Sequence, residues 1–148
     1  MLKKLPILLV LLGSLASVHS VAQPLSEPTQ LAQAVAAIQL KPKWQRIEIN
    51  EQLPRSYRLR LNYKPTSLRT PIVGRQEAAA DTTEIARAML AELAKEGKDP
   101  AKDQISLSVE AQQDAGKGPT GKSLTRHFGG TVYDYDTNQL AFRPYRPR

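Results

Sequence analysis

The sequence predicts an α+β fold: a small antiparallel or mixed sheet of about five strands with one main helix packed on one face. Two observations predict it. Apolar residues recur at helical spacing in two segments and at every second position in several others. Because the expected strands alternate apolar and polar residues instead of being apolar throughout, the sheet should have one face in water. The predicted order is helix, strand, strand, loop, helix and three strands.

The main helix is predicted over residues 81–97. The run from Asp81 to Glu84 is a variant of the capping box, and Gly97 can adopt the left-handed conformation that ends a helix. A second, N-terminal helix is predicted over 29–39 and should end before Pro42. The main helix should bury a stripe of residues four apart: Ile85, Met89 and Leu93.

Five strands are predicted from alternating residues, at 44–50, 56–64, 105–110, 124–136 and 140–145. The first two should form a hairpin because a short polar segment joins them. Gly129 and Gly130 indicate a bulge or bend within the fourth strand. Long loops are expected at 64–80 and 112–123, where no periodicity is visible.

The first 22 residues read as a cleavable signal peptide, with Lys3 and Lys4 before an apolar run. Cleavage is expected after Ala22, although a cut after Ser20 fits the same pattern. Export would lower the formal net charge from +7 to +5, because two lysines leave and no acid does. The mature chain should have a flexible lead at 23–28, one domain at 29–148 and no membrane span. Since the chain has no cysteine, a periplasmic or secreted bacterial protein is expected.

Basic residues supply the candidate binding site for an anion or a partner. Some lie on one face of the second predicted strand, and others lie in or beside a Gly-rich loop whose backbone N–H groups can bind anions. The alternative is a solvated sheet face on which Glu48 and other acids neutralise the strand's cations. The candidates are Arg58, Arg60, Lys64, Lys117, Lys122 and Arg126.

The segment from Gly116 to Ser123 matches the phosphate-loop pattern G-x-x-x-x-G-K-[ST] in full. That pattern binds nucleotides only when a helix follows it directly. Here Gly129 and Gly130 follow closely, and the intervening residues lead into a predicted strand. We therefore expect a connection between two strands and predict neither a nucleotide nor any other cofactor.

Metal and catalytic sites are not predicted. Asp134, Asp136 and Asn138 resemble the start of a calcium loop, but Gln139 and Tyr145 replace its required Gly and Glu, so a hairpin turn is expected. His127 is the one histidine that would remain after cleavage, and it has no cysteine partners with which to hold zinc.

Three classes of function remain. The preferred one is a non-enzymatic binding or assembly module of the bacterial envelope, with an envelope protein or an anionic polymer as partner. Nucleic acid is not expected, because the tyrosines and the cations of the second strand fall on opposite faces. The alternative is a periplasmic inhibitor or immunity-type protein that uses a loop as a plug. The third class is a small hydrolase that uses carboxylates such as Glu48, Glu110 or Asp134.

Overall fold

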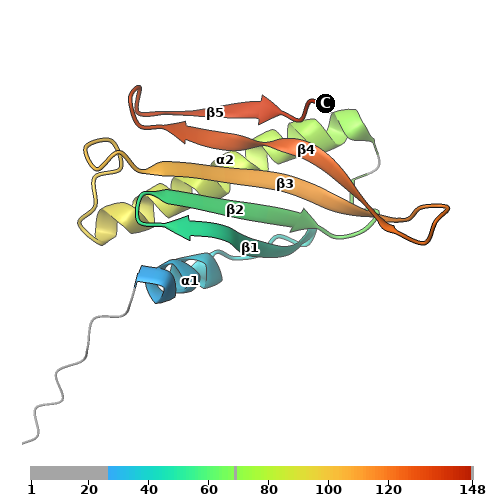
Figure 1. The fold of residues 1–148 in the computed structure, drawn as a ribbon, viewed down its shortest axis with the longest axis horizontal. Coiled ribbons are helices and arrows are strands. Elements are labelled where there is room, and N and C mark those ends of the chain that lie inside the picture. Colours follow the sequence, from blue (N-terminus) through green and yellow to red (C-terminus); the bar gives the residue numbers. More distant parts are fainter. Residues whose placement is uncertain (1–26, 69, 148) are drawn as a thin grey trace, which may run out of the picture.

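The computed structural model describes residues 27–68 and 70–147 (Figure 1). The predicted signal peptide and most of the predicted lead lie outside the described residues. Glu27 and Pro28, expected in the lead, belong to the first helix instead.

A mixed five-stranded sheet forms the body of the protein, in the order β1-β2-β3-β4-β5 (Figure 1). Neighbouring strands are antiparallel except β2 and β3, which are parallel and are connected through a helix. This architecture confirms the predicted α+β class. The strands are β1 Trp44–Leu53, β2 Ser56–Tyr63, β3 Ser106–Lys117, β4 Ser123–Asp134 and β5 Gln139–Pro144.

Two helices accompany the sheet. The long helix α2, Pro71–Lys95, lies across one face and contacts β3, β4 and β5. The short helix α1, Glu27–Ala37, lies beside β1 and also contacts α2 (Figure 1). Neither helix in the described part of the chain is long and apolar enough to cross a membrane.

The start of the main helix differs from the prediction. It begins at Pro71 and not at Asp81, so most of the expected 64–80 loop is helical. Thr70 is the N-cap, and its side chain accepts a hydrogen bond from the Val73 N–H at 3.2 Å. Proline is favoured in the first turn because its missing N–H would have no partner there. The helix ends at Lys95, two residues before the predicted end, and Gly97 takes the expected left-handed conformation with a φ of 79°.

The second expected loop, 112–123, is also mostly regular structure. Pairing between β3 and β4 continues to Lys117 and Ser123, which leaves only a tight turn between the two strands. The loop prediction was wrong because the Gly and Lys residues of this segment show no alternating pattern. The two strands nevertheless pair, and each supplies hydrogen-bond partners for the backbone groups of the other. The predicted bulge at Gly129 is present as a shift of register between β3 and β4.

The core lies between α2 and the near face of the sheet. The predicted helix stripe and the apolar face of β2 are both buried in it. Trp44 also joins this core, because a register shift between Trp44 and Arg46 breaks the simple alternation expected for β1. The opposite face of the sheet carries mainly polar residues and is left open by the helices. We call it the open face.

Candidate functional site

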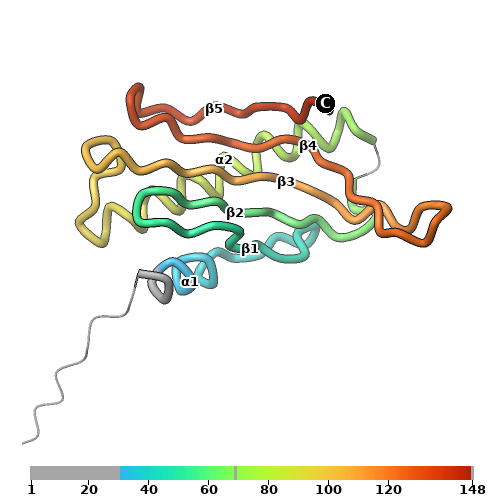
Figure 2. Tube along the Cα trace, in the orientation of Figure 1, coloured from blue at the N-terminus to red at the C-terminus, as the bar shows by residue number. Residues whose placement is uncertain are grey.

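The β3–β4 hairpin projects past the end of the neighbouring strand. Pairing of β2 with β3 stops at Tyr63 and Gln113, whereas β3 continues to Lys117 (Figure 1). Its turn is closed by two backbone hydrogen bonds, from Gly118 N–H to the Lys122 carbonyl at 2.8 Å and from Gly121 N–H to the Gly118 carbonyl at 2.9 Å. The trace in Figure 2 shows this orange turn extending at one end of the sheet.

The phosphate-loop pattern is therefore built as the turn of a hairpin. A strand starts at Ser123, where the nucleotide-binding motif needs the first turn of a helix. Gly116 and Gly121 have positive φ values of 87° and 76°, which explains both glycines by turn geometry. The structure thus contains the backbone of a tight connection in place of a helix N-terminus aimed at phosphates.

Four of the six predicted basic residues lie at this end of the sheet, and we call them the basic end: Lys64, Lys117, Lys122 and Arg126. Gln113 places two of them. Its side-chain amide donates to the Lys64 carbonyl at 3.1 Å, and it is the register partner of Arg126. The other two lie at the tip, where Lys117 pairs with Ser123.

A hollow of about 620 Å³ opens beside the basic end. It is lined by Arg126, by the segment from Gln113 to Gly116 and by the chain after Lys64. The acid of this segment, Asp114, accepts a hydrogen bond from the Gly116 N–H at 2.8 Å. None of the four cations forms an ion pair within the described residues. The basic end therefore has a net positive charge that is free to meet an anion.

Arg58 and Arg60, the other two predicted residues, lie elsewhere, on the open face of β2. Arg58 lies 3.6 Å from the Glu51 carboxylate. Arg60 donates at 2.8 and 3.0 Å to the Asn50 side-chain oxygen once the Asn50 amide is oriented with that oxygen toward the guanidinium. These surroundings fit the alternative to a binding site, a solvated sheet face on which acids and amides are the partners of the two arginines.

Glu48 shows the same balance on the open face. Its carboxylate accepts from Arg46 at 2.6 Å and from the Asn62 amide at 2.9 Å. The bond from Arg46 is the main cause that lowers the pKa of Glu48, and the amide and the Arg60 charge add to it against the opposing effect of burial. A carboxylate held in this way is a poor proton donor near neutral pH.

The other residues that the sequence singled out take part in turn hydrogen bonds or in a surface ring contact. Asp134 accepts from the Asp136 N–H at 3.0 Å, and Asn138 accepts from the Tyr133 hydroxyl at 2.8 Å, as expected for a turn. His127 is exposed and stacks on Tyr145. Among the described residues, no group of three or more His, Cys, Asp or Glu side chains is placed to hold a metal ion.

Sequence reasoning missed Asp81, a carboxylate that is only 2% exposed. It accepts from the Trp44 indole at 3.0 Å and the Tyr63 hydroxyl at 2.8 Å, and the Lys43 ammonium lies 2.9 Å away. Burial raises the pKa of Asp81, but Lys43, Trp44 and Tyr63 outweigh it and hold the pKa below its usual value. Burial, and after it the interaction with Asp81, raises the pKa of Tyr63. This cluster attaches α2 to the β1–β2 hairpin, and its sequence signal is an acid four residues before the buried stripe.

The chain matches no protein-family model, no curated protein and no solved structure. The assignment of a site therefore depends on the geometry described above.

Proposed function

We propose that the protein is a non-enzymatic binding module of the bacterial envelope that holds an anionic polymer at its basic end. One observation carries the proposal: four cations without ion-pair partners among the described residues gather at one projecting end of the sheet. The other predicted cations lie beside acids of the open face, Arg58 near Glu51 and Arg60 opposite Glu48, and are not part of the site.

A polymer suits this arrangement better than a small anion. The cations are spread from the end of β2 to the tip of the hairpin, and Lys117 and Lys122 are exposed. Spread, flexible and solvated charges hold a repeating anion through many weak contacts, whereas a small anion needs converging donors in a closed site. Affinity should therefore depend on the number of ionic contacts.

The test compares charge-neutralised variants on two probes, inorganic polyphosphate and polygalacturonate, which carry phosphate and carboxylate respectively. Lys117→Gln/Lys122→Gln should weaken binding by about tenfold at low salt, because each surface contact contributes up to about 1 kcal/mol. Arg58→Gln/Arg60→Gln is the matched control, since it removes the same charge from the open face. Binding is measured by fluorescence anisotropy with labelled polymer.

Equal losses in the two double variants would show that net charge alone governs binding, and the site assignment would then be wrong. Absence of binding to both polymers at low salt would reject the polymer as partner. A preference for one probe identifies the anionic group that the basic end favours.

The projecting hairpin itself favours a second candidate, an inhibitor or immunity-type protein that inserts the turn into a partner. The turn is short, closed by two hydrogen bonds and held by a paired stem. Polymer binding should depend on the lysines, whereas a plug should depend on the shape of the turn. A photo-cross-linker at Thr120 should capture one envelope protein at high salt if the plug is correct, and nothing specific if the polymer is the partner.

A further inference from the structure

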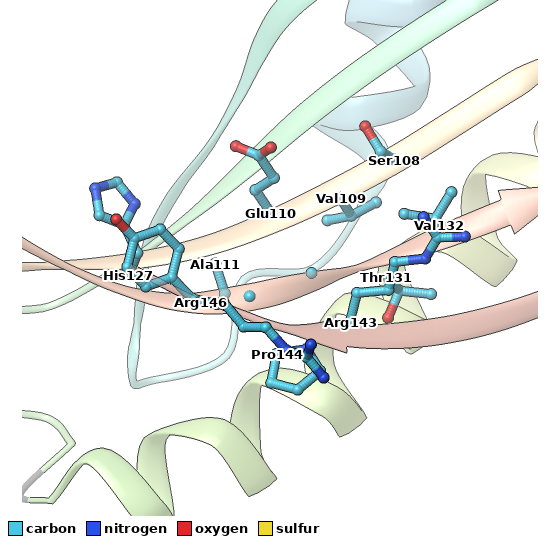
Figure 3. Close-up of a pocket in the computed structure, with 13 residues that line it drawn as sticks. Ser108, Val109, Glu110, Ala111, His127, Thr131, Val132, Arg143, Pro144 and Arg146 are labelled. Atoms are coloured by element: carbon cyan, nitrogen blue, oxygen red, sulfur yellow. The ribbon is translucent and has the colours of Figure 1, made fainter. Parts of the chain in front are cut away.

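A second hollow, of about 440 Å³, lies on the open face over β3, β4 and β5 (Figure 3). It shares no lining residue with the hollow beside the basic end. Its volume is within the range of about 300–1,000 Å³ that is typical of small-molecule sites.

A glycine forms the floor of this hollow. The strand register places Glu110, Gly130 and Arg143 in one row across β3, β4 and β5. Gly130 cannot gain a side chain without movement of the backbone, because a Cβ there would lie 2.4 Å from the Val109 carbonyl oxygen. The row therefore has a permanent gap between an acid and an arginine.

Opposite charges face each other across the gap. Figure 3 shows Glu110 and Arg143 rising on the same side of the strands, away from α2. Neither forms an ion pair within the described residues. Their strands are separated by two interstrand spacings, or about 10 Å. A ligand with a cation at one end and an anion at the other would complement this pair.

One end of the hollow carries two rings. His127 and Tyr145 have ring centroids 5.1 Å apart with an interplanar angle of 30°. Tyr145 is 49% exposed, so its ring is accessible to a ligand. Aromatic surfaces of this kind bind planar or apolar groups at small entropic cost.

We propose that this hollow binds a short peptide of about two residues with free ends. Its ammonium group meets Glu110, its carboxylate meets Arg143, and an apolar or aromatic side chain packs on His127 and Tyr145. The length follows from geometry: two extended residues span about 7 Å, and a contact of about 3 Å at each end gives about 13 Å between the charged groups, which flexible side chains on strands about 10 Å apart can reach. Because this hollow and the basic end are separate, the peptide site can be tested independently of the proposed function.

The test titrates the ¹⁵N-labelled protein with the dipeptide Ala-Phe and follows amide chemical shifts. Saturable shifts should map to the residues around the floor, Ala111, His127, Gly130 and Arg143. N-acetyl-Ala-Phe and Ala-Phe amide each lack one terminal charge and should bind at least about fivefold more weakly. Equal binding of the blocked and free forms would overturn the proposal, and so would shifts confined to the basic end or a response that does not saturate.

Protein variants provide an independent measurement. Glu110→Gln should weaken binding of Ala-Phe but leave binding of the N-acetylated form unchanged. Arg143→Gln should weaken binding of Ala-Phe but leave binding of Ala-Phe amide unchanged. Glu51→Gln and Arg58→Gln are the controls, because they make the same charge changes on the open face outside the hollow. Controls that weaken binding as much as the test variants would contradict the assignment.

Discussion

Asp81 is a buried carboxylate that connects three elements through single side chains. Its donors Trp44 and Tyr63 belong to β1 and β2, while Asp81 itself lies in the middle of α2. Lys43 adds the compensating charge. Removal of the carboxylate would leave the two buried donors, Trp44 and Tyr63, without an acceptor, which costs more than the hydrogen bonds themselves contribute.

The variant Asp81→Ala should lower the free energy of unfolding by about 2–4 kcal/mol, because it leaves the two buried donors without an acceptor, while Lys43 keeps its ion pair with Glu77. Urea unfolding at pH 7 measures it. Glu84→Gln is the control: Glu84 pairs with Lys41 but its side chain is 57% exposed, so the change should stay within about 0.5 kcal/mol. Similar values for the two variants would contradict a structural role for the buried carboxylate.

The lowered pKa of Asp81 also predicts how stability depends on pH. A carboxyl whose pKa is lower in the folded state contributes stability above its unfolded-state pKa, near 3.8, and loses that contribution as the pH falls through the folded-state value. The free energy of unfolding should therefore fall with acid below about pH 4. Urea titrations at several pH values should show a smaller fall in Asp81→Asn; an identical fall would exclude Asp81 as its source.

At the scale of elements, α2 approaches the sheet closely at Gly74. A Cβ at this position would lie 2.2 Å from Cε1 of Phe128, a residue of β4. Phe128 also meets Tyr63 edge to face, with ring centroids 5.9 Å apart. Glycine is needed here because a ring on the sheet occupies the space of its side chain.

Gly74→Ala should destabilise the protein by about 1–3 kcal/mol through overpacking, although alanine favours a helix by about 1 kcal/mol. Thermal and urea unfolding measure the effect. The same substitution in a Phe128→Leu background should cost less, because the smaller side chain vacates the contact. A stabilising effect of Gly74→Ala in the native background would show that the helix does not approach β4 so closely.

Sequence patterns predicted the elements well where one face is apolar. They placed β2 and the second half of α2 because burial on one side imposes a strict period on the sequence. They missed the first ten residues of the helix because two starts competed. The pair Thr70-Pro71 is a valid start, but Asp81 resembles an N-cap, and only its burial against Lys43 shows that it lies within the helix.

At the scale of the whole molecule, the sequence supplied the residue types of the candidate site but not their grouping. Arg60 and Lys64 are close in sequence, yet one lies among partners on the open face and the other at the basic end. The parallel pairing of Tyr63 with Gln113 decides this, because it brings the end of β2 to the base of the hairpin. Strand order of this kind depends on the path of α2 and is not visible in local patterns.

A salt titration tests most directly whether the cations of the basic end hold an anionic polymer. Contacts between cations and a flexible polyanion release counterions, so the logarithm of the association constant should fall linearly with the logarithm of salt concentration. Four contacts predict a slope of about −3 for the native protein on polyphosphate, and about half of that for Lys117→Gln/Lys122→Gln. A slope near zero, or one that the double variant leaves unchanged, would contradict the claim.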